Sequence, residues 1–392
     1  VPGDRSLSTN AGWILAAQLV YRLTGQTLAQ FAESRLFAPL GMRDTRYFGD
    51  RSAVIPNLAT PYSPRGDGFR VSRNTYDGAI VGAGGVHTTI EDFGRWLDNY
   101  DQATVGGRDV ITIMTTPTTL NDGTPAKSGA TQAYAVGLNA GTLRGLPVVS
   151  HGGSWQGFRA HFLRFPAERT AVATFCNHSG AGPDSLARHV AAIYLGDRMQ
   201  ADSAALWRAT LAAASVVSQD VATLRTRTGV WRNVARGEVR RTRLSGDTLS
   251  LIADARTRMV PLGADRYRAG ADAELRFERV AGGTERMFVR TSSDTMTFTR
   301  ADTVVLSAAK RAEDVGEYRN DEIETTQRWA VERDTLVLYA NEWRQGVLEP
   351  TYADGFLRGS AVIDVQRDTR GRIVGYTVQS GRVRNLRFTR VR

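Results

Sequence analysis

Lysine is almost absent from this sequence. All but two of its 50 basic residues are arginines, and the exceptions are Lys127 and Lys310. Any chemistry within these residues that needs a lysine to activate a serine must therefore use one of the two. The arginines are dispersed and often alternate with apolar residues, so the net charge of +10 indicates solvated faces and codon bias rather than nucleic-acid binding.

Cysteine, long apolar runs and a leader sequence are also missing. The single cysteine, Cys176, excludes an internal disulfide, and its apolar strand-like surroundings predict a buried structural thiol. No run approaches the roughly 18 consecutive apolar residues of a spanning helix, so no membrane span is expected. The chain begins at Val1 without a signal-peptide pattern, which predicts a processed or truncated start. Its five histidines lack ligand spacing, and we expect neither metal nor cofactor.

Residues 1–200 alternate helix and strand signals. A helix is predicted over 12–24, closed by Gly25, and Thr27–Gln30 and Thr88–Glu91 have the pattern of capping boxes at two further helix starts. Strands are expected over 146–150, 158–165 and 170–177, and another helix over 185–195.

The second half of the chain has a different pattern of predicted secondary structure. An Ala- and Ser-rich connector over 201–223 precedes short β runs separated by Gly, Asp and Arg turns. Thr228–Asn233 matches Val315–Asn320, and Asp247–Leu251 matches Asp334–Leu338. In both pairs the same long stretch of sequence separates the first segment from its match. This repeat predicts tandem antiparallel β-barrel-like domains over 224–302 and 312–392. Alternation places Leu249, Leu251, Leu336 and Leu338 toward the cores.

Several short motifs follow one another within the first 180 residues. They are Pro2-Gly3 with Ser8–Trp13, Leu23–Thr27, Phe37–Thr45, Gly82–Thr88 with Asp92, Tyr134–Leu138, and Ser150–Phe158, which contains His151-Gly152-Gly153. Their order resembles that of class C β-lactamases and penicillin-binding serine hydrolases. The resemblance implies a multi-domain α+β protein: an incomplete β-lactamase/transpeptidase-like α/β domain over 1–200, followed by the two barrel-like domains. That organisation is similar to the D-aminopeptidase-like members of the family.

The resemblance also implies a site. Asn10 would hydrogen-bond a substrate amide, and His151 would stand in the family's third motif. Ser8 falls where the family usually has tyrosine, so the proton shuttle departs from the class C pattern. Gly152, Gly153 and Ser154 would form the strand edge along which the substrate lies, with the Ser154 N–H as an oxyanion donor.

The family's nucleophile belongs to a Ser-x-x-Lys segment upstream of these motifs, and that segment is absent from the 392 residues. Ser307–Lys310 has the formal pattern but lies between the β domains. Lys127–Gly129 mimics a third motif but lies in a loop-like stretch. We therefore expect this chain, as given, to be inactive.

Two functions remain open at this point. The first is a serine hydrolase that attacks an amide or ester through an acyl-enzyme, with a β-lactam, a D-amino-acid peptide or a small ester as substrate. The second is a non-catalytic binding or regulatory protein on the same fold. The resemblance implies a periplasmic or secreted setting and a small-molecule or peptide partner. Nothing in the sequence indicates the oligomeric state.

Overall fold

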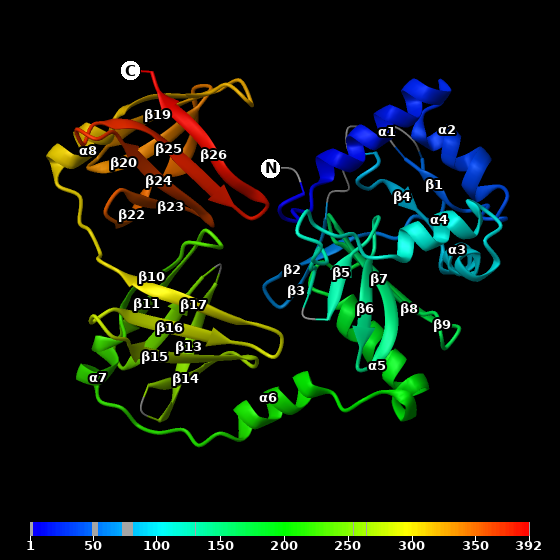
Figure 1. Ribbon diagram of the computed structural model, residues 1–392, viewed down its shortest axis with the longest axis horizontal. Coiled ribbons are helices and arrows are strands. Elements are labelled where there is room, and N and C mark those ends of the chain that lie inside the picture. The colour runs from blue at the N-terminus through cyan, green and yellow to red at the C-terminus, as the bar shows by residue number, and fades with distance from the viewer. Residues whose placement is uncertain are drawn as a thin grey trace. The chain divides into compact units, whose positions relative to one another are not determined.

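The computed structural model describes residues 3–48, 54–72, 81–129, 131–253, 255–263 and 265–391 (Figure 1). The chain divides into two compact units, Val1–Ala201 and Asp202–Arg392. Among the described residues, no helix has the length and apolar character required to cross a membrane.

The first unit is built on a five-stranded antiparallel sheet in the order β5-β6-β7-β8-β9. These strands are β5 (Gln132–Tyr134), β6 (Asn139–Leu143), β7 (Leu146–Trp155), β8 (Phe158–Phe165) and β9 (Thr170–Cys176). The strands predicted over 158–165 and 170–177 are confirmed as β8 and β9. The strand predicted over 146–150 is longer than expected, because β7 continues past Ser150 through the whole His-Gly-Gly segment.

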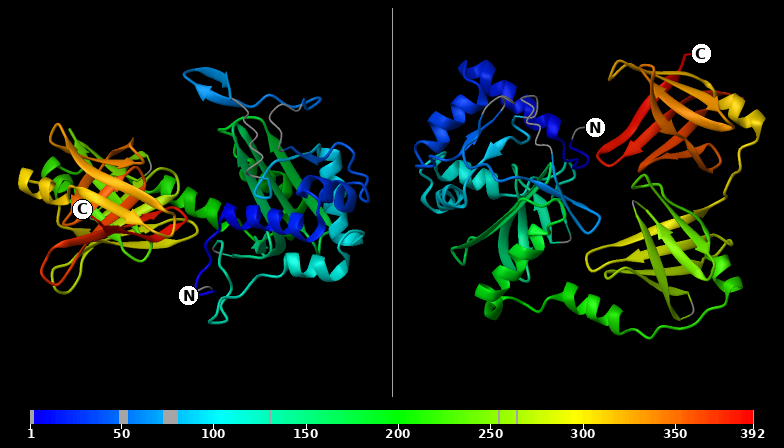
Figure 2. Two further views of the ribbon diagram at one scale, coloured as in Figure 1. Left: turned by 90° about the horizontal axis from the view of Figure 1, so that it is seen from above. Right: turned by 180° about the vertical axis from the view of Figure 1, so that it is seen from behind.

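Helices cover both faces of this sheet. On β8, Leu163 and Phe165 pack against α5 (Pro183–Leu195), and the preceding Phe162 packs on the other face toward α3 (Ile90–Gln102). This alternation follows from the two-residue period of a strand. The unit also contains α4 (Gly107–Thr115), the pair β1 (Arg46–Tyr47) and β4 (Val86–His87), and the hairpin of β2 (Tyr62–Arg65) and β3 (Gly68–Val71), which projects from the unit in the left view of Figure 2.

The helix that carries the first motif is α1 (Asn10–Thr24). Thr9 caps its start and Gly25 ends it in the left-handed conformation. α2 (Leu28–Ala32) begins with the predicted capping box, in which Thr27 and Gln30 satisfy each other's backbone N–H groups, and continues into a π-helical turn over Glu33–Phe37. Along α1 an apolar stripe stays exposed, with Leu15 at 68%, Leu19 at 56% and Leu23 at 77%.

Hydrogen bonds among the motif residues Thr45, Thr88 and Asp92 connect this part of the unit. Asp92 of α3 is almost fully buried and accepts hydrogen bonds from the Thr45 hydroxyl (2.9 Å) and the Asp44 N–H (2.7 Å). Thr45 also bonds Thr88 at 2.7 Å. The predicted cap of α3 at Thr88 is wrong for this reason: Thr88 is engaged by Thr45, and Thr89 caps the helix by accepting from the Asp92 N–H.

The second unit contains two antiparallel β domains, in green-yellow and orange-red in Figure 1, as expected from the sequence. The first is a closed barrel in chain order. Its strands are β10 (Gly229–Asn233), β11 (Glu238–Ser245), β12 (Thr248–Ile252), β13 (Arg256–Gly263), β14 (Arg266–Ala269), β15 (Ala273–Arg279), β16 (Glu285–Arg290) and β17 (Thr295–Ala301). Two helices precede it, α6 (Ser203–Ala213) and α7 (Val221–Thr226), so the predicted connector is largely helical.

The second β domain follows α8 (Ala308–Asp314) and is a nine-stranded sheet. Its strands are β18 (Gly316–Asn320), β19 (Thr325–Glu332), β20 (Thr335–Ala340), β21 (Trp343–Val347), β22 (Glu349–Tyr352), β23 (Gly355–Arg358), β24 (Ala361–Arg367), β25 (Ile373–Ser380) and β26 (Val383–Arg390). β18 pairs with β26, while β21 and β22 form the two ends of the sheet although only Leu348 separates them in the chain.

Side chains fill both interiors. Leu249 and Leu251 lie in the core of the first domain with Trp231, and Leu336 and Leu338 lie in the core of the second with Trp329. The predicted orientation of these four leucines is confirmed. The internal repeat and the boundary between the two β domains stay predictions.

Candidate functional site

The predicted His-Gly-Gly segment forms one free edge of the sheet. β6 pairs with β7 from Leu146 only as far as Ser150, whose partner is Asn139. β8 continues to pair with β7 on the other side, from His151 opposite Phe162 to Trp155 opposite Phe158. Within the described residues, positions 151–155 therefore have a strand on one side only. His151 is half-buried, and Gly152, Gly153 and Ser154 are exposed.

Such an edge carries unsatisfied backbone groups. In an antiparallel ladder, successive residues direct their N–H and C=O groups to opposite neighbours. Every second residue of the 151–155 stretch thus turns a donor and an acceptor away from β8. An extended peptide or amide can bind there by continuing the sheet, and the glycines leave space above and below the strand.

Contacts place the start of α1 at the same end of the sheet. The ring of Trp13 lies against Gly137, in the turn between β5 and β6, where an added Cβ would be 3.3 Å from the ring. Tyr134, just before this turn, has its ring centroid 6.3 Å from that of His151. Asn10 is the first residue of α1 and Ser8 precedes the cap, and both are exposed. Their convergence with His151 on one cleft stays a prediction.

Sequence reasoning assigned no role to His161, which lies directly behind this edge. It is the register partner of Gly152, so the two residues face the same side of the sheet. The imidazole occupies the space that a side chain on Gly152 would need, since an added Cβ would lie 3.1 Å from its Nδ1. Because cross-strand register is invisible in a single sequence, only the pairing of β7 with β8 reveals this residue.

Charged groups from α5 surround His161. Its Nε2 lies 3.2 Å from Oδ1 of Asp184, although the two atoms are not aligned as a hydrogen bond, and Asp184 also receives the Arg188 Nε at 2.8 Å. Burial lowers the pKa of His161, and the attraction of Asp184 opposes this effect without reversing it. At neutral pH the ring is therefore uncharged.

The loop before β2 and the end of β3 pack on the tip of the same hairpin. Gly157 follows the free edge with φ +97°, and a Cβ there would meet Pro61 at 2.8 Å and Ser72 at 2.9 Å. Tyr62 accepts from the Ser179 N–H and donates to the Asn177 carbonyl, so this loop also joins the end of β9. The hairpin that carries the candidate edge is thus held from outside the sheet.

Both alternative lysine motifs have other roles. Ser307 caps α8 by accepting from the Lys310 N–H at 3.1 Å. The ammonium of Lys310 lies 3.1 Å from carboxylate oxygens of Asp314 and Asp354. Burial alone would lower the pKa of Lys310, but these partners raise it, so the amine is held charged and cannot serve as a base. Lys127 is exposed and bridges Ala133 of β5, two strands away from β7.

Cys176 differs from expectation in one respect. It is half-buried rather than buried, because it is the last residue of β9, which is an edge strand of the sheet. Among the described residues, no group of three His, Cys, Asp or Glu side chains is placed to hold a metal ion.

Comparisons with known proteins agree with the motif order. The family model described as β-lactamase matches residues 1–195. The D-aminopeptidase of Gluconobacter oxydans is 26% identical over 192 residues, which are 49% of this chain and 35% of that protein. The D-aminopeptidase of Brucella anthropi is 27% identical over 212 residues, which are 52% of this chain and 38% of that protein. The chain thus spans little more than a third of the length of these relatives.

Among solved structures, the octameric penicillin-binding protein homologue from Pyrococcus abyssi is 17% identical, with a TM-score of 0.47 over 88% of this chain and 65% of that one. The family model, the D-aminopeptidase relatives and the order of the motifs agree on the first unit. Residues 1–195 therefore belong to the β-lactamase family, in the group of class C β-lactamases and penicillin-binding proteins.

Proposed function

We propose that this chain carries the substrate-binding strand of a serine hydrolase that cleaves amide bonds, with D-amino-acid peptides or amides as its substrate class. The free edge of β7 over 151–155 is the observation that supports this proposal. The matched D-aminopeptidases make an amide substrate the first choice over an ester or a β-lactam.

The proposed arrangement uses the backbone first. The substrate amide lies antiparallel to β7, the Ser154 N–H points to the oxygen on which negative charge develops, and Asn10 holds the amide from the α1 side. Donors of this kind act most strongly where charge appears in the transition state. His151 lines the same edge, and Ser8 relays a proton where relatives in the family use tyrosine. A serine hydroxyl is a poor base alone, so the proposed mechanism takes its base from the lysine of the family's Ser-x-x-Lys motif.

That lysine is neither of the two present. Lys310 is held charged by carboxylates, and Lys127 lies two strands from β7. The proposal therefore requires a Ser-x-x-Lys from outside these 392 residues, and a periplasmic or secreted protein is the setting proposed for it. The competing function is a non-catalytic binding protein, which the serine at position 8 favours, because that departure weakens the proton shuttle.

The coding sequence upstream of Val1 separates the two functions. A Ser-x-x-Lys there, together with hydrolysis of D-alanine p-nitroanilide by the protein that includes it, supports the hydrolase. In that protein His151→Ala should lower kcat/KM by about 100-fold, the range for loss of one site donor. Ser307→Ala is the matched control and should leave turnover unchanged. Loss of turnover in Ser307→Ala, or an upstream sequence without the motif, would overturn the assignment.

A further inference from the structure

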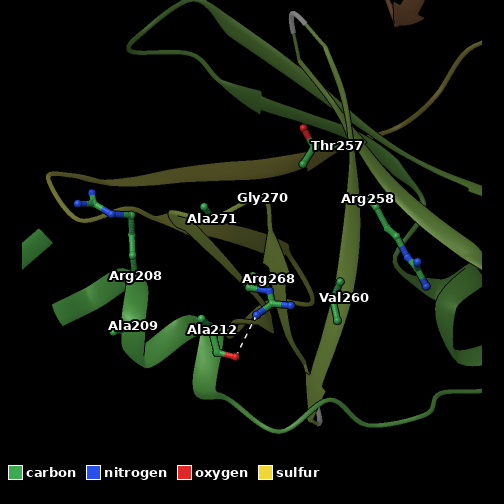
Figure 3. A pocket seen from close by; sticks show the side chains of 9 residues that line it. All are labelled: Arg208, Ala209, Ala212, Thr257, Arg258, Val260, Arg268, Gly270 and Ala271. Carbon is green, nitrogen blue, oxygen red and sulfur yellow. Dashed lines mark hydrogen bonds between the residues drawn. The ribbon is translucent and has the colours of Figure 1, made fainter. Parts of the chain in front are cut away.

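A groove of about 690 Å³ lies between α6 and the β13–β14 hairpin of the first barrel (Figure 3). This volume is within the range of small-molecule sites, about 300–1,000 Å³. The lining combines small or apolar side chains with three arginines from three elements. The residues are Ala209, Ala212, Val260, Ala271, Thr257, Gly270, Arg208, Arg258 and Arg268.

The walls of the groove are fixed in place. α6 is attached to the barrel by the Trp207 indole N–H, which donates to the Asp272 carbonyl at 2.8 Å, and by the buried side chain of Leu211. The Arg268 Nη1 donates to the carbonyls of Leu211 (3.0 Å) and Ala212 (3.4 Å) and so satisfies the end of the helix. A preformed groove of this kind loses little ordering entropy when a ligand enters.

The positive charge of the groove is largely uncompensated. Arg268 uses Nη1 for α6, and within the described ranges no other bond of its guanidinium is found, which leaves the Nε and Nη2 donors available. Arg258 is exposed and has no carboxylate within 4.0 Å among the described residues, and Arg208 has only Asp272, at 4.0 Å. Asp272 is itself engaged by the Ser292 hydroxyl at 3.0 Å.

Figure 3 shows how these groups are arranged. The guanidinium of Arg268 lies between Ala212 and Val260, inside the groove, whereas Arg208 and Arg258 extend outward at its two margins. A charged anchor therefore stands beside an apolar surface, and the margins add a positive field that attracts anions.

We propose that this groove binds an organic anion, a carboxylate joined to an apolar chain or ring. The carboxylate meets the Nε and Nη2 edge of Arg268, because planar guanidinium and carboxylate groups pair through two parallel hydrogen bonds. The apolar part lies along Ala209, Ala212 and Val260, where its burial adds affinity in proportion to the area removed from water. This binding site is independent of the hydrolase proposed for the first unit.

Calorimetric titration of the 392-residue chain with 4-phenylbutyrate tests the proposal. We expect a dissociation constant below about 1 mM, at least about fivefold weaker binding of the uncharged 4-phenylbutan-1-ol, and no measurable binding of acetate. Arg268→Gln should weaken binding about tenfold or more, as expected when a charge-assisted hydrogen bond is lost. Arg266→Gln is the matched control: Arg266 lies on the same strand but is paired with Glu274 at 2.5 Å, and binding should change less than about twofold.

Because Arg268 also holds α6, a second variant separates binding from attachment of the helix. Ala209→Trp fills the groove from the α6 side without removing any hydrogen bond, and it should abolish binding while circular dichroism and thermal unfolding stay unchanged. Equal affinity for the acid and the alcohol would overturn the proposal, since the groove would then be only apolar. Absence of binding at several millimolar 4-phenylbutyrate would also overturn it, as would unaltered binding in both Arg268→Gln and Ala209→Trp.

Discussion

Alanine substitutions at the two adjacent strand glycines, Gly152 and Gly153, should have opposite effects on stability. Both residues lie on the free edge of β7, and neither has positive φ. An added Cβ at Gly153 would make an ordinary contact, 3.8 Å from the Ala160 Cβ. At Gly152 it would lie 3.1 Å from the His161 Nδ1 and 3.5 Å from the Ala160 carbonyl oxygen.

The expected magnitudes follow from two terms. Replacing glycine by alanine where the backbone allows it stabilises a protein by about 0.4–1 kcal/mol, mainly by restricting the unfolded chain. Gly153→Ala should gain about this amount. Gly152→Ala should gain the same stability from its unfolded chain. It should also lose about 1–3 kcal/mol of stability because the His161 ring must move, so the net loss is about 1 kcal/mol. In a unit of roughly 200 residues, 1 kcal/mol corresponds to about 2–4 °C in Tm.

Scanning calorimetry of the full 392-residue chain measures both shifts, and His161→Ala completes a double-mutant cycle with Gly152→Ala. If the ring is the obstacle, the double variant should recover about 0.5–2 kcal/mol relative to the sum of the single changes. Equal Tm values for Gly152→Ala and Gly153→Ala would refute the packing of His161 against the free edge. So would an additive cycle.

Other predictions concern charge, caps and core hydrogen bonds. Burial lowers the pKa of His161 below its unfolded value of about 6.5, so the stability that depends on the neutral ring is complete above that pH and falls as the solution is acidified. Between pH 7.5 and 5, the Tm of His161→Gln should therefore decline less than that of the unsubstituted protein. His87, whose pKa burial also lowers, contributes in the same direction and remains in that variant. Ser307→Ala should cost about 1 kcal/mol in urea unfolding through loss of the α8 cap. Thr242→Val leaves the buried Trp231 indole N–H without its 2.9 Å acceptor and should cost about 1–3 kcal/mol by the same measurement, whereas no change would contradict the closed core.

Local signals were sufficient for much of the fold because local physics decides those parts. The capping box at Thr27 needs only Gln30 three residues later, and the period-two pattern of Asp-Thr-Leu-x-Leu places its leucines inside whichever barrel forms. The cap of α3 was misplaced by one residue because Thr88 and Thr89 have equal capping ability, and a residue 43 positions away decided between them. Thr45 engages Thr88, which leaves Thr89 for the helix.

The end of β7 shows the same limit. Two consecutive glycines weaken any local strand signal, so the prediction stopped at Ser150. The strand continues to Trp155 because β8 pairs with it residue by residue, and Phe162, Leu163 and Phe165 hold β8 in the core. Tertiary pairing thus makes a strand out of the segment that the motif order had already marked as functional.

The residues around the free edge differ in whether the sequence alone could identify them. Asn10 and His151 belong to short motifs whose order is visible in the sequence, whereas His161 acquires its position only through the β7–β8 register. Unpaired edges normally invite association with other chains, and proteins keep them short or shield them. Here the edge spans five residues, its hairpin tip is packed by Pro61 and Ser72, and the partly buried imidazole of His161 supports it from behind. An edge that is supported in this way, and that pairs with no further strand in the described part of the chain, is suited to receive an extended ligand. The stability assigned to Gly152 and His161 is the measurable sign of that support.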